Sequence, residues 1–180
     1  TRIQAEQYDM NISGNLNIVG TDIQAKNSNI RGGNVHLGAE KTVNLREHSK
    51  NQSKGSWYRN EQESNRVETT HRTTIAGDSV NIEATKGKVT AEGAKVSAKT
   101  TAIYGEQGVN LRGVKATTTQ MARAEFKNET ARLKTGLSSQ DSSVQHYTAT
   151  ELTTEQDLIL GGKGDVHLTG VVANVDGALL

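Results

Sequence analysis

The sequence contains no cysteine and only one tryptophan and one phenylalanine among its 180 residues. Without cysteine there is neither a disulfide framework nor a thiolate metal site. With 33 % hydrophobic and 3 % aromatic residues, the chain is poorly supplied for the thick core of a globular domain. No apolar run approaches ~18 residues, so no transmembrane segment is expected. These absences favour a fold with a narrow core.

An excess of charge of one sign is also absent. The chain has 21 Lys and Arg against 20 Asp and Glu, which gives a formal net charge of +1. Such a chain has no general field that attracts nucleic acid or anionic lipid, so no nucleic-acid partner is expected. The sequence begins at Thr1 with neither an initiator methionine nor a visible signal peptide. We therefore expect it to be a segment of a longer protein.

What the sequence does contain is a recurring tripeptide of an aliphatic residue, usually Asn or His, and a second aliphatic residue. Its copies are Leu16-Asn17-Ile18, Val35-His36-Leu37, Val43-Asn44-Leu45, Val80-Asn81-Ile82, Val109-Asn110-Leu111 and Val166-His167-Leu168. Side chains alternate between the two faces of a strand, so each copy sends two aliphatic residues into a core and one polar residue outward. Glycine or a small polar residue usually precedes the tripeptide, which is turn chemistry.

The spacing of these copies indicates a stack of coils. Leu16 and Val35 are 19 residues apart, whereas Val35 and Val43 are 8 apart. A coil of roughly 20 residues that holds two or more short strands fits both steps. The prediction is an all-β fold, a right-handed parallel β-helix (solenoid), as a single segment over residues 1–180. A solenoid needs only rows of Val, Ile, Leu and Ala as its core, so the low hydrophobic content is acceptable there.

The predicted coils occupy residues 1–45, 75–116 and 152–180, enough for about six coils at roughly 20 residues each. The remaining stretches, 46–74 and 117–151, are polar and are predicted to be extended excursions from the stack. Between Val67 and Ile75 of the first excursion, β-branched and polar residues alternate with the period of a strand. We therefore expect a hairpin with its tip near Ser56–Glu61.

The second excursion is also expected to be hairpin-like. Ala122, Ala124 and Phe126 alternate with charged residues, which favours a strand. Residues 120–134 could instead form a helix, because they are rich in good helix formers. Gly136 and the run Ser138–Ser143 then indicate a turn.

Two runs, Gly14–Ala25 and Gly33–Leu45, resemble the haemagglutinin repeats of filamentous haemagglutinin-type exoproteins. These exoproteins are the secreted partners of two-partner secretion systems and include the toxins of contact-dependent growth inhibition. The segments Ser49–Trp57 and Thr73–Ile82 resemble the later repeat block of that family, in which polar stretches interrupt the coils. The resemblance covers nearly the whole chain.

The resemblance implies a structural and interaction segment of a large bacterial exoprotein that is secreted or located on the cell surface. This segment would be part of a filamentous rod that presents or delivers a distant adhesive or toxin domain. The resemblance also implies an outer-membrane secretion partner for the full-length protein. Two alternatives remain: a direct adhesin module that binds a receptor or glycan on a target cell, and a β-helical component of a phage or secretion spike.

One cluster of residues is a candidate for surface binding. Trp57 and Tyr58 lie beside Lys54 and Arg59 in a polar stretch that has no core role. Large amphipathic side chains next to cations can anchor on glycans, proteins or lipid headgroups. Trp57 could instead pack against the flank of the solenoid.

No catalytic, cofactor or metal site is predicted. Two isolated pairs combine a histidine with a glutamate: His36 with Glu40, and His71 with Glu68. In strands such spacings do not converge on one ion, so we expect no metal ligands there. Most aspartates lie near glycines at turns, where local hydrogen bonds explain them. The run Gly161–Asp165 lacks the spacing of a phosphate-binding loop. We therefore expect no enzymatic activity and no cofactor.

Overall fold

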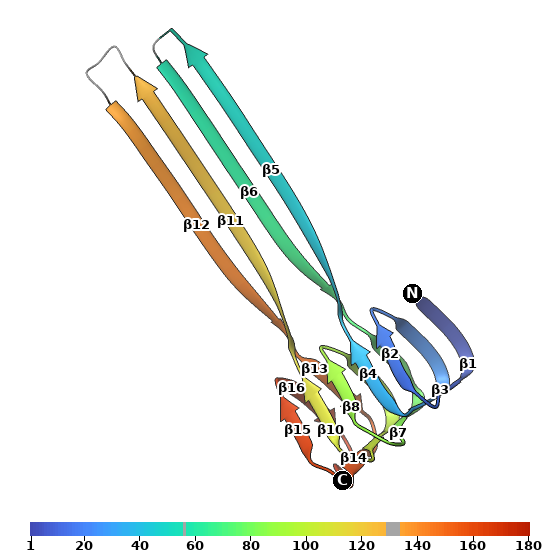
Figure 1. The fold of residues 1–180 in the computed structure, drawn as a ribbon. Helices are drawn as coiled ribbons and strands as arrows, with labels where there is room; N and C mark the ends of the chain where they lie inside the picture. The colour runs from blue at the N-terminus through green and yellow to red at the C-terminus, as the bar shows by residue number, and fades with distance from the viewer. Residues whose placement is uncertain (56, 129–133) are drawn as a thin grey trace. The chain divides into compact units, whose positions relative to one another are not determined.

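The computed structural model describes residues 1–55, 57–128 and 134–180, and the chain separates into two compact units. The first, which we call the stacked unit, comprises Thr1–Glu40, Thr70–Val114 and Tyr147–Leu180. The second, the hairpin unit, comprises Lys41–Thr69 and Lys115–His146. Every regular element in the described ranges is a β-strand (Figure 1). The predicted all-β class is therefore confirmed.

The stacked unit consists of two sheets whose strands are parallel. The seven-stranded sheet contains β1 (Arg2–Asn11), β3 (Asp22–Gly32), β7 (Thr74–Ala84), β9 (Lys95–Gly105), β13 (Thr150–Thr154), β14 (Leu158–Gly162) and β16 (Val171–Val175). The five-stranded sheet contains β2 (Asn15–Val19), β4 (Asn34–Gly38), β8 (Val89–Glu92), β10 (Val109–Arg112) and β15 (Val166–Thr169). Within the stacked unit the chain alternates between the two sheets, except that the consecutive strands β13 and β14 both pair with β9 of the larger sheet. We call one passage through both sheets a level (Figure 1).

Strands of successive levels pair in register, and the paired residues are about one repeat apart in the sequence. Asn15 pairs with Asn34, a step of 19 residues that matches the period predicted from the sequence. The next step in the larger sheet is longer, because Asp22 pairs with Thr74. The first polar excursion lies within this step. Parallel pairing thus continues from level to level across the insertion.

The core consists of rows of aliphatic side chains at matching positions of successive strands. In the larger sheet one buried row contains Ile23, Ile75, Val96 and Leu152, and in the smaller sheet another contains Leu16, Val35, Val89 and Val109. Ile82 is fully buried between Ile30 and Ile103, whereas its neighbour Asn81 is exposed. Burial of apolar surface at roughly 25 cal/mol per Å2 stabilises these rows.

The tripeptide at Val43 does not lie in this core. Val43 and Leu45 are 48 % and 57 % exposed and belong to a strand of the hairpin unit. Extension of the first coils to residue 45 is therefore wrong. The alternation of apolar and polar residues is the same in a coil strand and in a hairpin strand, so this pattern does not reveal where the chain leaves the stack. Each boundary of the hairpin unit lies two to five residues before the predicted one.

The hairpin unit is a four-stranded sheet made of two hairpins. Its strands are β5 (Glu40–Lys54), β6 (Trp57–His71), β11 (Val114–Asn128) and β12 (Lys134–Thr148), in the order β12-β11-β6-β5. The central strands β6 and β11 are antiparallel, and their pairing runs from Val67 with Thr118 to Trp57 with Asn128. The preference for a strand over a helix is confirmed for residues 120–128, while residues 129–133 of that prediction lie outside the described residues.

Two predicted turns have different positions in the structure. Gly55, with a φ of +62°, forms part of the first turn, and Trp57–Glu61 already belong to β6; Ser56 lies outside the described residues. The run Ser138–Ser143 is not a turn but lies in β12, as does Gly136. Serine favours turns only locally, and pairing with a neighbouring strand overrides that preference.

Both hairpins return to the stack at equivalent positions, each marked by a buried threonine. Thr73 and Thr150 are matched in register, because Thr74 and Glu151 both pair with Lys95. The Thr73 hydroxyl donates to the Gly38 carbonyl (2.7 Å), and the Thr150 hydroxyl donates to the Arg112 carbonyl (2.6 Å). Each bond joins the point of return to the strand end from which the chain departed. These bonds also satisfy the buried hydroxyl groups.

Arg72 connects the two points of return. Its Nε donates to the Gly93 carbonyl (3.2 Å), its Nη2 to the Ala149 carbonyl (2.6 Å) and its Nη1 to Glu151 Oε1 (2.9 Å). The hydrogen bond from Arg72 holds the pKa of Glu151 below its ordinary value. One guanidinium group therefore bridges parts of the chain that are almost 80 residues apart.

We predict that Arg72→Ala lowers the free energy of unfolding by about 1–3 kcal/mol, because three charge-assisted hydrogen bonds are lost. Arg72→Lys should recover only part of this loss, since a single ammonium group cannot reach all three acceptors in the same planar geometry. Urea unfolding of the three proteins measures the effect. Equal stability of the alanine variant and the parent would contradict the role assigned to Arg72.

Ile82→Ala should lower the free energy of unfolding by about 2–5 kcal/mol, because it opens a cavity inside a continuous row. The matched control is Asn81→Ala, which removes only an exposed hydrogen bond to Asn29 (3.1 Å). We expect the control to lose less than about 1 kcal/mol. Comparable losses in the two variants would mean that the inward and outward faces of β7 are wrongly assigned.

Candidate interaction surface

The four residues predicted for surface binding gather at the turn of the first hairpin. Lys54 ends β5, and Trp57, Tyr58 and Arg59 begin β6 on the other side of Gly55. Alternation along β6 places Trp57 and Arg59 on one face of the sheet and Tyr58 on the other. Both aromatic side chains are half-buried, whereas Lys54 and Arg59 are exposed. The structure thus brings the four residues to one end of the hairpin, distributed over two faces.

Phe126 of β11 is a further aromatic residue at this end of the hairpin unit. It pairs with Arg59, which places its side chain on the same face as Trp57. The Phe126 ring is 43 % exposed and lies against Gly136 of β12, where a Cβ atom would collide with the ring. The absence of a side chain at Gly136 therefore makes room for Phe126. Sequence reasoning did not include Phe126 in the site, because its position depends on the pairing of β6 with β11.

Tyr58 and Arg59 make polar contacts in this region. The Tyr58 hydroxyl donates to Glu125 Oε1 of the neighbouring strand (3.3 Å). Arg59 forms an ion pair with Glu61 on the same face. This end of the hairpin unit therefore combines aromatic side chains with the Arg59–Glu61 ion pair and the exposed Lys54. Such a composition is suited to contact with a protein or glycan surface.

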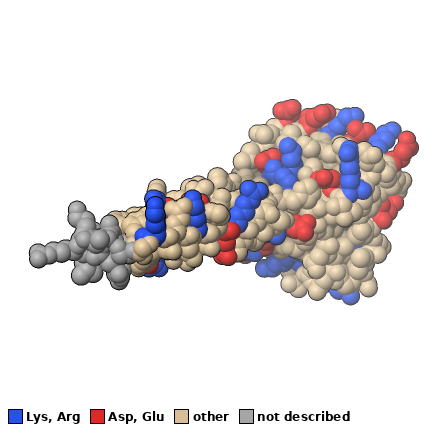
Figure 2. All heavy atoms as spheres, turned by 90° about the horizontal axis from the view of Figure 1, so that it is seen from above, with Lys and Arg blue, Asp and Glu red and all other residues tan. Residues whose placement is uncertain are grey.

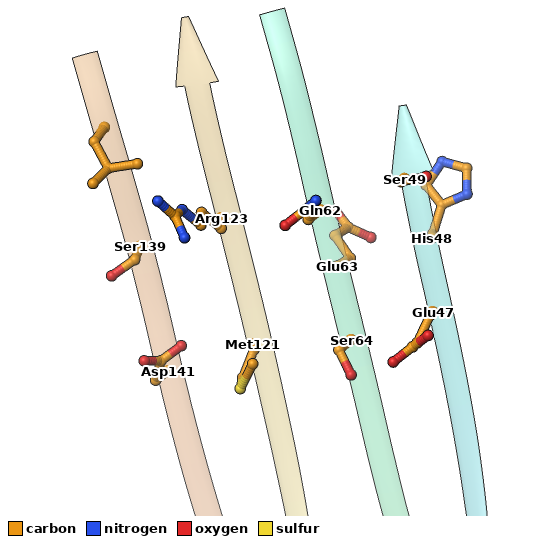
Figure 3. Close-up of a pocket in the computed structure, with 11 residues that line it drawn as sticks. Glu47, His48, Ser49, Gln62, Glu63, Ser64, Met121, Arg123, Ser139 and Asp141 are labelled. Carbon is orange, nitrogen blue, oxygen red and sulfur yellow. The ribbon is translucent and has the colours of Figure 1, made fainter. Parts of the chain in front are cut away.

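A shallow depression with a volume of about 760 Å3 crosses all four strands of the hairpin unit (Figure 3). Its lining includes the carboxylates of Glu47, Glu63 and Asp141 together with Arg123. Met121 and Leu137 are its only large apolar side chains, and none of its lining residues is Phe, Tyr or Trp. The depression offers mainly hydrogen-bonding groups, and the imidazole of His48 is the one ring in its lining.

A carboxylate also connects the two hairpins, near the ends of β6 and β11 that lie away from the turn at Gly55. The backbone amide of Thr117 donates to Glu68 Oε2 (3.1 Å), and Arg66 donates to Glu68 Oε1 (3.0 Å). The Thr117 amide, followed by Arg66, lowers the pKa of Glu68 below its ordinary value. This contact links β6 to β11 through an ionised side chain.

Charges of the stacked unit are arranged as pairs between successive levels. Lys99 bonds to Asp78 (2.9 Å), which raises the pKa of Lys99. Arg31 likewise contacts Glu83 at the paired position of the next level (3.2 Å). Figure 2 accordingly shows cationic and anionic side chains interspersed, without a large area of one sign on the visible face. Such a surface has no strong field to attract nucleic acid.

The residues weighed as metal or phosphate ligands have local partners. His71 Nε2 lies 3.9 Å from Asp22 Oδ2, and Lys163 of the glycine-rich run bonds to Glu106 (2.6 Å). His36 is on β4, where the smaller sheet pairs it with Asn17. Within residues 1–55, 57–128 and 134–180, no three His, Asp or Glu side chains gather as they would around a metal ion.

Parallel strands that repeat every 19 or 20 residues around rows of aliphatic side chains define a β-structured repeat protein. The Hemagglutinin repeat family matches residues 1–59 and 53–179, so the chain belongs to this family. Its members are structural or adhesin repeats rather than enzymes, in filamentous exoproteins that are secreted or displayed at the cell surface through two-partner secretion.

Neither a curated protein nor a solved structure matches the chain. Among the residues that the structure describes, no helix has the length and hydrophobicity needed to cross a membrane.

We predict that the amide signal of Thr117 reports the ionisation of Glu68. Its proton chemical shift should titrate with a midpoint below 4.5, the ordinary value for the Glu68 carboxyl. Because the folded state lowers this pKa, the contact stabilises the sheet above the unfolded pKa and is lost as the pH falls through the folded pKa. Two-dimensional NMR measures the titration.

The Glu68→Gln variant should abolish this titration, and Glu63→Gln should leave it unchanged. A Thr117 midpoint at or above 4.5 in the parent protein would contradict the assigned contact.

Proposed function

We propose that the chain is a segment of a right-handed parallel β-helix that forms part of a filamentous rod in a large secreted bacterial exoprotein. In this proposal the rod presents or delivers a distant adhesive or toxin domain, in adhesion or in contact-dependent growth inhibition. The observation that carries the proposal is the parallel register, which continues through β1, β3, β7, β9, β13 and β16 despite two inserted hairpins. A stack of this kind can hold a distant domain in place, and it needs no active site to do so.

The handedness follows from a general rule. Connections between parallel strands of one sheet are right-handed in nearly all proteins, because strand twist favours that direction. The two hairpins are then excursions from one continuous helix. Val166 and Leu168 of β15, the last strand of the smaller sheet, continue two core rows but are 41 % and 50 % exposed. Their exposure supports continuation into a longer rod. A further level would bury them.

The partners of this proposal lie outside the segment. The full-length exoprotein would cross the outer membrane through its dedicated secretion partner, and its distant domain would meet the target cell. The segment itself would need no receptor, cofactor or substrate. Many of its surface charges are paired with charges of the opposite sign. This pairing supports a solvated rod that does not bind other surfaces through a net charge of one sign.

A second candidate function is that of an adhesin module, in which the hairpin unit itself binds a receptor or glycan. Trp57, Tyr58, Arg59 and Lys54 would form the contact together with Phe126. Aromatic side chains at the end of a polar hairpin favour this function, because such residues contribute most of the energy at many interfaces.

Binding of the purified chain to bacterial and host cells distinguishes the two functions. The rod function predicts no saturable binding, whereas the adhesin function predicts binding that Trp57→Ala with Tyr58→Ala reduces at least about tenfold. The matched control is Val43→Ala with Leu45→Ala, which removes two exposed apolar side chains elsewhere in the same hairpin. Flow cytometry with labelled protein measures the effect, after thermal unfolding has shown equal stability. Saturable binding that survives the Trp57 and Tyr58 changes would contradict both assignments.

A further inference from the structure

The two outer strands of the hairpin unit differ in how well they are protected against pairing with another strand. The order β12-β11-β6-β5 makes β5 and β12 the edges of this sheet. An edge strand presents unpaired amide and carbonyl groups along its outer side. Proteins usually protect long edges with charged residues, proline or bulges. Both edges here are 15 residues long, and the chain contains no proline.

The first edge, β5, carries charged residues near both ends and in its middle, and its longest uncharged run is Thr42–Leu45. Its charged residues are Glu40, Lys41, Arg46, Glu47, Lys50 and Lys54. Between Gly136 and Thr148 of β12, by contrast, Asp141 is the only Asp, Glu, Lys or Arg residue. The other side chains on this stretch are mostly Ser, Gln and small or apolar residues. The second edge is therefore open to another strand.

Exposed apolar side chains occur on both edges, and on β12 they lie in a stretch that has a single charge. Leu137 is 63 % exposed and Val144 is 52 % exposed. A strand added beside β12 would cover part of both side chains and would pair the free backbone groups. The sheet already contains a contact of this type, since β6 and β11 come from different hairpins and pair over eleven residues. Pairing between separate hairpins is thus an established mode of association in this fold.

We propose that β12 is a dimerisation edge, through which two copies of this chain join by antiparallel pairing of β12 with β12 of the second copy. A two-fold axis relates the strands, so the contact is closed and stops at a dimer. Main-chain hydrogen bonds supply the affinity, as in other cases of strand addition. A second copy fits better than a basic segment would, because its β12 is equally poor in charge.

Asp141 limits the register of this pairing. If Asp141 lay directly opposite Asp141 of the second copy, two carboxylates would repel each other. The two nearest registers that keep the same faces together place Asp141 opposite Ser139 or opposite Ser143 of the second copy. A serine hydroxyl can donate to the carboxylate in either register. Both serines are exposed in the single chain and are available for this contact.

This geometry predicts effects of opposite sign for two pairs of substitutions. Ser139→Asp with Ser143→Asp places a carboxylate opposite Asp141 in either register, and should weaken dimerisation at least about tenfold. Ser139→Lys with Ser143→Lys places an ammonium group there, and should preserve or tighten the dimer. Sedimentation equilibrium of the 180-residue chain from about 1 to 500 µM measures both dissociation constants. Circular dichroism and thermal unfolding verify that the variants remain folded.

Ser49→Asp with Ser53→Asp on β5 is the matched control, because it adds the same charge to the opposite edge. We expect it to leave the dissociation constant unchanged. The proposal is overturned if the parent chain stays monomeric over this range. It is equally overturned if the substitutions on β12 have no effect, since another surface then makes the contact. If β12 paired instead with the basic β5 of a second copy, the Asp substitutions on β12 would tighten the dimer and the Lys substitutions would weaken it. That result would also exclude the β12 dimer.

Discussion

Parallel backbone pairing between successive levels is the constraint on which the rest of this structure depends. It brings aliphatic residues at the same position of each repeat into one row, and the stack is stabilised although only a third of the sequence is hydrophobic. The same register places Lys99 beside Asp78 and Arg31 beside Glu83. A slip of one residue would turn the aliphatic residues outward and separate these charges. Backbone, core and surface therefore specify a single alignment.

Sequence periodicity predicted the stack because its information is local. In Leu16-Asn17-Ile18 and Val80-Asn81-Ile82, the alternation correctly identifies the buried and exposed residues. The same alternation failed at Val43, because strands of a coil and of a solvated hairpin have the same period of two. It failed again at Ser138–Ser143, where pairing with β11 decides the conformation. Which strand a segment pairs with is a property of the whole chain.

The candidate interaction surface, too, could be predicted from the sequence only in part. A polar stretch with Trp57 and Tyr58 could be recognised from composition, since the stretch lacks residues for a core. Phe126 could not be assigned to it, because Arg59 and Phe126 become neighbours only through the pairing of two hairpins. The Glu68 contact with Thr117 depends on that same pairing. Composition thus identified the first hairpin as a surface element, and the register of β6 and β11 determined what that surface contains.

The paired strands of each hairpin also bear on how the chain can fold. Joining β3 to β7 requires closure of a loop of about 50 residues, and the entropy cost of closure grows with loop length. A hairpin forms from local contacts within microseconds and brings its own two ends together. Once β5 and β6 have paired, Glu40 and His71 lie at the same end of the hairpin, and the stack can grow as though the insertion were a short turn. The insertions can therefore be long without making assembly of the stacked unit slow.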